Sequence, residues 1–225
     1  MRISGLLLCC LLLWGCATPD SSWFPLAAGY WWQYSVTRSI RGEAHEQKLV
    51  IASLPVVSIK GERLYPRRRP DGREEYFEKS ATGIARVDTE DGSRTVVLQV
   101  PFATGTRWQG SSRILFLEVS GAFEATYNRH IRQDIRMDYE IDSVSELVKV
   151  KAGVYRNCLR VKGSGSLYGG GGSMKEFMNI DSINIDTVDW YAPGIGLVKR
   201  TRREYTLPER FENQYSEELQ AFRRR

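Results

Sequence analysis

The chain has 225 residues, of which 42% are hydrophobic and 26% charged, and its formal net charge is +5. This length allows one substantial domain with a real core. The positive charge is concentrated in arginine-rich runs at residues 67–69, 199–203 and 223–225. Because the N-terminus indicates export, nucleic acid is excluded as a partner. Anionic headgroups or acidic proteins are the expected counterparts, unless the runs are solvated strand or loop faces.

Residues 1–15 are predicted to be a signal peptide. Arg2 supplies its positive start, and Leu6 to Leu13 form an apolar run that is too short to anchor in a bilayer. The next residues, "LWGC" ending at Cys16, resemble the bacterial lipobox. That resemblance implies cleavage before Cys16, attachment of a diacylglycerol to its thiol and acylation of its new amine, for example by palmitate. The alternative is an ordinary signal peptide followed by a chance cysteine.

Residues 16–22 are then a polar, lipidated tether. Ala17 resembles the sorting signal for the outer membrane in diderm bacteria, so we expect an anchor on the periplasmic face of that membrane. Several acyl chains make such an attachment stable. The mature chain loses one arginine and no acid, which lowers the charge to 5 − 1 = +4. Cys158 becomes the only unmodified thiol, so no intramolecular disulfide is possible, and its strand-like surroundings predict a small buried hydrophobic residue and not a nucleophile.

Residues 23–225 are predicted to form a single, mainly β domain with little helix. Stretches of alternating, β-branched and aromatic residues recur about every ten residues and are separated by Gly, Pro and Asp-Gly turns. This spacing indicates a curved antiparallel sheet, a half-barrel or barrel-like structure. Residues 211–222 could form a short amphipathic helix, but a final antiparallel strand is favoured. The glycine-rich stretch 163–173 is predicted to be a flexible loop.

A ten-residue phrase occurs twice in the chain. "FPLAAGYWWQ" at residues 24–33 and "VPFATGTRWQ" at residues 100–109 share five residues at a constant offset of 101 − 25 = 76 positions. In each copy proline ends the preceding segment, glycine permits a turn and tryptophan can bury a large apolar surface. The phrase therefore predicts a corner before a strand, with Trp32 and Trp108 as core residues. A ligand-stacking tryptophan pair is the alternative. The two copies are also compatible with related halves that start near residues 24 and 100.

No combination of residues predicts catalysis. His45, expected in a turn, and His130 lack the spacing of metal ligands, and no serine nucleophile motif is present. Asp181, Asp186 and Asp189 lack the glycine that a calcium loop requires, and their alternation indicates a strand. We therefore expect no catalytic residue, no metal site and no cofactor, and we interpret the chain as a protein that is not an enzyme.

Three phrases together resemble a group of uncharacterised bacterial envelope lipoproteins: "FPLAAGYWWQY" (24–34), "VKVKAGVYRNCLRV" (148–161) and "WYAPGIGLVKR" (190–200). The resemblance implies a curved antiparallel sheet similar to the half-barrels of periplasmic lipoprotein carriers, often with a helix or loops on the concave side. It implies no established chemistry. We therefore expect a lipid-anchored binding module, most simply for an apolar or lipid-like ligand. The alternative is a structural or assembly lipoprotein that docks to another envelope protein and has no ligand cavity.

Overall fold

The computed structural model describes residues 22–40, 42–115, 134–168, 179–208 and 211–224. These residues form strands and no helix, which confirms the mainly β prediction. The strands are β1 (Tyr30–Ile40), β2 (Glu43–Ser53), β3 (Val57–Ile59), β4 (Glu62–Arg68), β5 (Glu74–Ser80), β6 (Gly83–Val87), β7 (Arg94–Gln99), β8 (Arg107–Arg113), β9 (Asp134–Val150), β10 (Gly153–Tyr168), β11 (Ser182–Ala192), β12 (Gly196–Leu207) and β13 (Glu212–Arg224).

All the strands belong to one antiparallel sheet. The order across it is β7-β6-β5-β4-β2-β1-β13-β12-β11-β10-β9-β8, with β3 paired to β4 beside this path. The sheet therefore consists of two consecutive meanders, β1–β7 and β8–β13, which are joined where the last strand, β13, pairs with the first, β1. The final antiparallel strand predicted near the C-terminus is confirmed as β13.

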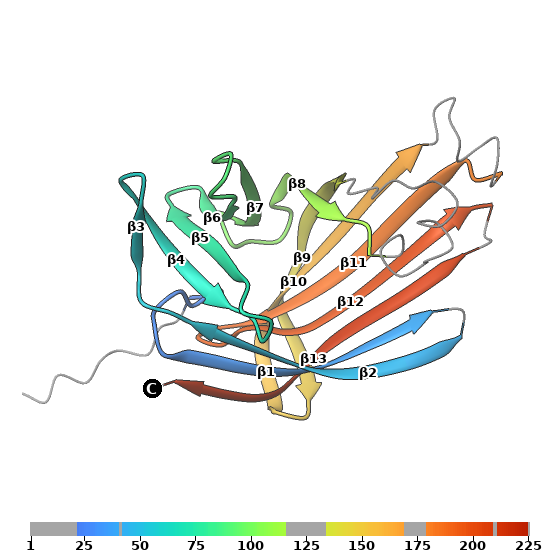
Figure 1. Ribbon diagram of the computed structural model, residues 1–225. Helices are drawn as coiled ribbons and strands as arrows, with labels where there is room; N and C mark the ends of the chain where they lie inside the picture. The colour runs from blue at the N-terminus through green and yellow to red at the C-terminus, as the bar shows by residue number, and fades with distance from the viewer. Residues whose placement is uncertain (1–21, 41, 116–133, 169–178, 209–210, 225) are drawn as a thin grey trace, which may run out of the picture.

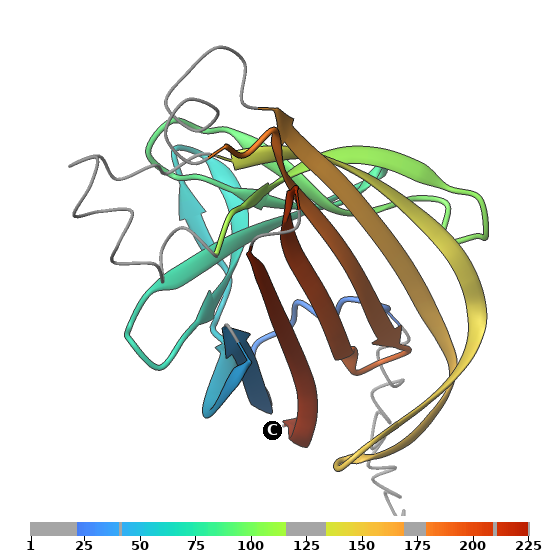
Figure 2. The ribbon, with the colours of Figure 1, turned by 90° about the vertical axis from the view of Figure 1, so that its right-hand side faces the viewer.

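The sheet curls into a nearly closed, barrel-like shape (Figure 1). The short strands β3–β7 fold over the long strands β1, β2 and β9–β13. Among the described residues, β2 and β4 join the two groups through the ladder pairs Ala52–Arg68 and Ser53–Arg67. The two ends of the sheet, β7 and β8, come together, where the hydroxyl oxygens of Thr95 and Ser111 are 3.5 Å apart. Figure 2 shows how strongly β9 and β10 bend to make this shape.

Three hydrophobic clusters fill the domain. The first contains Phe24 and Leu26, which precede β1 and insert among inward residues of the short and long strands, including Phe77 and Leu159. The second lies between β1, β13 and the bent end of the β9–β10 hairpin. The third is a group of isoleucines and Met137 at the other end of the long strands. Burial alternates along parts of several strands, for example at the start of β9 (Asp134–Val150), as the sequence pattern predicts.

The prediction of a loop at residues 163–173 is wrong for its first six residues. Gly163 and Gly165 lie within β10, which continues to Tyr168, and residues 169–173 lie outside the described part of the chain. A Cβ atom at Gly163 would lie 2.4 Å from Cε1 of Tyr139 on the neighbouring strand. The glycines therefore make room for side chains of β9 to lie across β10, a known role of glycine within a strand.

The repeated phrase forms the same kind of corner twice. Gly29 and Gly105 have φ angles of 88° and 89°, in the left-handed region that favours glycine, and β1 and β8 begin just after them. Each copy thus opens one of the two meanders. Two smaller predictions have opposite outcomes: Cys158 is fully buried, as expected, whereas His45 lies in β2 and not in a turn. His130 lies outside the described residues.

Candidate functional site: charged side chains inside the barrel

A row of charged residues crosses the inner face of the long strands. Directly paired residues of antiparallel strands share a face of the sheet. The row runs from β1 to β10 through Val36, Glu217, Arg200, Asp189 and Val161. Its three charged members are therefore flanked at both ends by valine, and Glu217 and Asp189 are only 4% and 7% exposed.

Arg200 is held by two carboxylates. Its Nε and Nη2 atoms donate to the two oxygens of Asp189 at 2.7 and 2.5 Å, and its Nη1 lies 3.8 Å from Oε2 of Glu217. The hydroxyl of Tyr191 donates to Asp189 at 3.0 Å, and that of Tyr215 donates to Glu217 at 3.1 Å. Burial raises the pKa of Glu217 above its usual range, and nearby Arg200 offsets this only in part.

The neighbouring Arg202 joins opposite walls of the barrel. Its Nε donates to Glu204 at 2.7 Å on β12, while its Nη1 donates to the hydroxyl of Ser112 at 2.6 Å on β8. The same carboxylate oxygen of Glu204 accepts the backbone N–H of Leu115 at 3.0 Å. Because the Arg202 and Glu204 side chains are 9% and 2% exposed, this pair is a buried cross-link.

Arg67, from β4, enters the same interior from the short strands. Its guanidinium carbon lies 4.0 Å from the ring centre of Phe24 and 4.5 Å from that of Trp32. Its Nη2 donates to the backbone carbonyl of Pro25 at 2.7 Å, but its buried Nε has no partner. Glu75, its partner in the sheet register, pairs with Arg69 instead at 3.7 Å.

Arg67 is therefore a partly buried cation held by aromatic rings and a carbonyl. Among the described residues no carboxylate lies within 4 Å of its guanidinium. Burial lowers its pKa to about 10, so it remains charged at neutral pH. A guanidinium with an unused N–H donor, set between apolar rings, is suited to an anionic oxygen attached to an apolar group.

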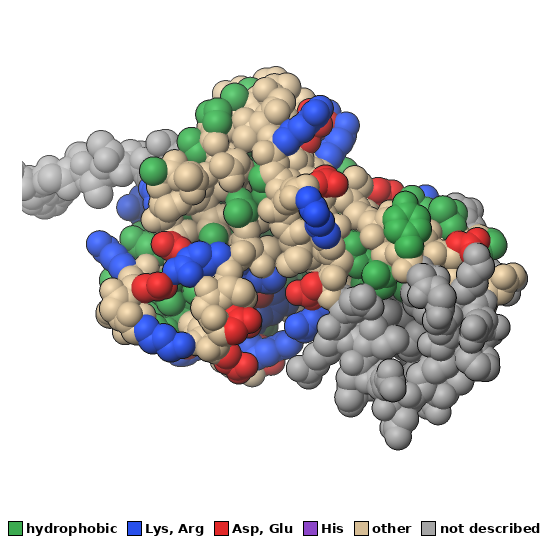
Figure 3. Space-filling model, turned by 90° about the horizontal axis from the view of Figure 1, so that it is seen from above, with side chains coloured by type: hydrophobic (Ala, Val, Ile, Leu, Met, Phe, Trp, Pro, Cys, Tyr) green, Lys and Arg blue, Asp and Glu red, His purple; other side chains and the backbone are tan. Residues whose placement is uncertain are grey.

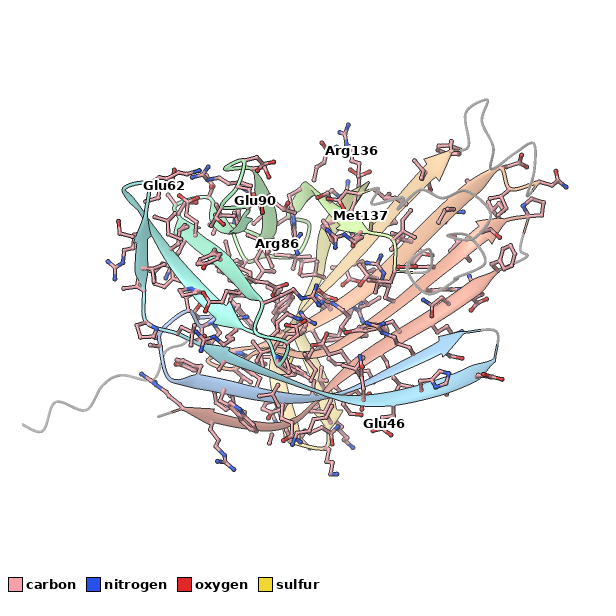
Figure 4. The ribbon with its side chains drawn as sticks, viewed as in Figure 1. Glu46, Glu62, Arg86, Glu90, Arg136 and Met137 are labelled. Atoms are coloured by element: carbon pink, nitrogen blue, oxygen red, sulfur yellow. The ribbon has the colours of Figure 1, made fainter. Side chains whose placement is uncertain are left out.

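Part of this charged interior remains accessible to solvent. Although Arg200 lies in the central row, 34% of its side chain is exposed, and the corresponding value for Arg69 is 31%. Seen from above, basic and acidic side chains lie together in and around a hollow (Figure 3). Figure 4 shows side chains from the long and the short strands filling the space between them. The interior thus combines an apolar packing with charges that solvent can reach.

The structure also has a shallow groove of about 300 Å³ on the outer face of the long strands. Two neighbouring rows of paired residues line it: Thr37, Ser216, Thr201 and Val188, and then Ser39, Gln214, Arg203 and Asp186. Four of these eight residues are Ser or Thr, so the groove offers several hydroxyl groups for hydrogen bonding.

The two tryptophans of the predicted site lie in different hydrophobic clusters. Trp32, 2% exposed, belongs to the second hydrophobic cluster and donates its Nε1–H to the carbonyl of Ile195 at 2.7 Å. Trp108, 8% exposed, belongs to the first cluster and stacks on Tyr139 with ring centres 5.5 Å apart. They do not form a tryptophan pair. Cys16 lies outside the described residues.

The sequence pattern did not predict that Arg67, Arg200 and Arg202 point into the barrel, because arginine runs suggest a solvated surface. In strand β12, alternation puts Arg200, Arg202 and Glu204 on one face, and that face is inward. The same alternation puts Asp186 and Asp189 on opposite faces of β11. Within the described ranges no three His, Cys, Asp or Glu side chains are grouped to hold a metal ion.

No protein-family model matches the chain, and no curated protein does. Among solved structures it is similar to a predicted exported protein with a YmcC-like fold from Bacteroides fragilis (TM-score 0.43, 15% identity). It is also similar to a predicted lipoprotein from Parabacteroides distasonis (TM-score 0.41, 14% identity). Each comparison covers 89% of this chain and 98% of the other. In the described part of this chain no helix is long and apolar enough to cross a membrane.

Proposed function

We propose that this chain is a lipid-anchored lipoprotein of the cell envelope whose β domain binds an amphiphile, a ligand with an apolar chain and an anionic headgroup. The anchor is Cys16, at the periplasmic face of the outer membrane, and binding requires no catalytic residue or cofactor. The supporting observation is Arg67, an inward cation with an unused Nε donor and aromatic rings on its faces. Arg69 and Arg200 add accessible positive charge nearby.

A second candidate is a structural or assembly role without a ligand. The observation in its favour is that Phe24 and Leu26 already occupy one end of the interior, where they pack with Phe77 and Tyr191. If these residues are a permanent plug, Arg67 holds the plug and not a ligand. In that case the outer surfaces of the barrel would contact another envelope protein.

Adjacent arginines provide a matched test of the two candidates. Arg67 faces inward, whereas Arg68 faces outward and pairs with Glu74 at 2.7 Å. The protein is purified gently, its retained molecules are identified by native mass spectrometry, and its affinity for the fluorescent fatty acid cis-parinaric acid is measured. We expect a retained acidic amphiphile and fatty-acid binding that is lost in Arg67→Met but kept in Arg68→Met. A bare protein mass and no fatty-acid binding would favour the assembly role.

The anchor is tested separately. In cells labelled with palmitate, we expect the wild-type protein to carry the label and to fractionate with membranes, and the Cys16→Ala variant to lose both properties. Continued labelling and membrane association of the variant would contradict lipidation at Cys16.

A further inference from the structure

The bent end of the β9–β10 hairpin has one packed face and one exposed face. We call residues 147–156 the hairpin tip. On its packed face, Val148, Val150 and Tyr155 belong to the second hydrophobic cluster. The backbone N–H of Ala152, in the turn, donates to the carbonyl of Leu219 at 3.1 Å, which ties the tip to β13. The tip is therefore held firmly against the body of the barrel.

The exposed face of the tip combines apolar and basic side chains. Leu147 and Val154 are 47% and 56% exposed and lie on this face. Lys149, which pairs directly with Val154, is exposed too, as are Lys151 and Arg156. Within the described chain none of these three cations has a carboxylate within 4 Å.

The nearest acidic residue of the hairpin does not neutralise this face. Glu146 pairs with Arg160, at 3.2 Å. The exposed face of the tip therefore carries three positive charges and no negative one. Exposed aliphatic side chains among unpaired cations match the surface of a bilayer, whose headgroups are anionic and whose acyl chains begin just below.

The tip also lies at the end of the molecule where the chain approaches from its anchor. The N–H of Gly194 donates to the carbonyl of Ser22 at 2.9 Å, and the next residue, Ile195, packs in the same cluster as the tip. Ser22 is six positions after Cys16 in the sequence, a span of at most about 20 Å. The tip and the C-terminal end of β13 both lie toward the bottom of the ribbon views (Figures 1 and 2).

We propose that the exposed face of the hairpin tip rests on a membrane rich in anionic lipid and thereby fixes the orientation of the barrel. This proposal rests on the lipid anchor of the proposed function. The short tether brings the tip close to the bilayer, where the cations of the tip and the headgroups attract each other. Leu147 and Val154 then enter the boundary between headgroups and acyl chains.

The test uses the acylated full chain with one environment-sensitive NBD label. The label is placed at Val154→Cys in the tip or, as a control, at Tyr168→Cys, a 76% exposed residue at the opposite end of β10. The native Cys158 is fully buried and stays unlabelled. In vesicles containing phosphatidylglycerol we expect a shift of NBD emission to shorter wavelength and quenching by doxyl lipids at position 154 only. In phosphatidylcholine vesicles the shift should be largely lost.

Charge variants give the matched control. The triple variant Lys149→Glu, Lys151→Glu and Arg156→Glu should abolish the response at position 154. The triple variant Lys48→Glu, Lys79→Glu and Arg136→Glu changes the net charge equally at exposed positions outside the tip and should preserve it. A water-like label at position 154 in anionic vesicles, or equal loss in both triple variants, would overturn the proposal. Failure of the anchor is distinct, because the protein would then not sediment with phosphatidylcholine vesicles.

Discussion

Arg67 and Arg200 both place a guanidinium inside the barrel, but their surroundings differ. Arg200 lies in a row of the long strands between Asp189 and Glu217, with a bidentate ion pair on one side. Arg67 comes from the short strands and is held by the rings of Phe24 and Trp32. The first region is a network that depends on its cation, since carboxylates would otherwise be buried alone. The second region is an apolar core that holds a cation without a carboxylate partner among the described residues.

The largest effect is expected from removing the ring that supports Arg67. Trp32→Ala should lower the free energy of unfolding by about 4 kcal/mol, because it leaves a large cavity and an unpaired carbonyl at Ile195. Urea denaturation measures this loss. Trp31→Ala is the matched control, since Trp31 is only partly buried and lies on the other face of β1, with Arg223 over its ring. Equal losses in the two variants would refute a core role for Trp32.

The next effect concerns the carboxylate-held region. Arg200→Met should lower the free energy of unfolding by about 3 kcal/mol, because it leaves Asp189 and Glu217 buried without their cation. This value is at the low end for a broken buried pair, since a third of the Arg200 side chain is exposed. Urea denaturation of Arg200→Met, Asp189→Asn and the double variant forms a double-mutant cycle. The double variant should lose less than the sum of the single losses, and strict additivity would contradict the network.

The same substitution at Arg67, in the aromatic region, should affect the free energy of unfolding much less. Arg67→Met should change the free energy of unfolding by less than about 1 kcal/mol. The substitution leaves no carboxylate without a partner, and the lost contacts with the rings are offset by the removal of a partly buried charge. The measurement is the same urea titration, performed beside Arg200→Met. A loss as large as that of Arg200→Met would show that the protein needs Arg67 for folding, and the comparison between the two regions would fail.

Much of the architecture could be predicted from the sequence because strand alternation and turn residues are local signals. The β class, the final strand and the corners after Gly29 and Gly105 followed from them. The continuation of β10 through Gly163 could not be predicted, because its cause is a ring from another strand, that of Tyr139. Glycine-rich composition alone indicates flexibility.

The charged residues of the interior could not be predicted from the sequence either, because their positions depend on pairing between strands. Alternation shows that Arg200 and Arg202 share a face, but only the register with β11 shows that Asp189 lies beside Arg200 and that this face is inward. Arg67 gave no signal, because the rings that hold it come from residues 24 and 32, far away in the chain. Arg68, in contrast, faces outward, as expected for an arginine run on a solvated surface. Pairing across strands, and not composition, decides which arginine of a run is buried.

The smallest effect is a dependence on pH within the Arg200 region. Burial raises the pKa of Glu217 above its ordinary value of 4.5, so the folded protein binds this proton more tightly than the unfolded chain. Between 4.5 and the folded pKa, the contribution of Glu217 to stability therefore falls as the pH rises. Glu217→Gln removes this titration and should gain stability relative to wild type as the pH rises through that window. Urea denaturation at a series of pH values measures the difference, with Glu218→Gln, whose carboxylate pairs with Lys199 on the outer face, as the control. If the stability difference between Glu217→Gln and wild type depends on pH no more than that of the control does, Glu217 carries no unfavourable buried charge. Arg200 would then neutralise both of its carboxylates fully.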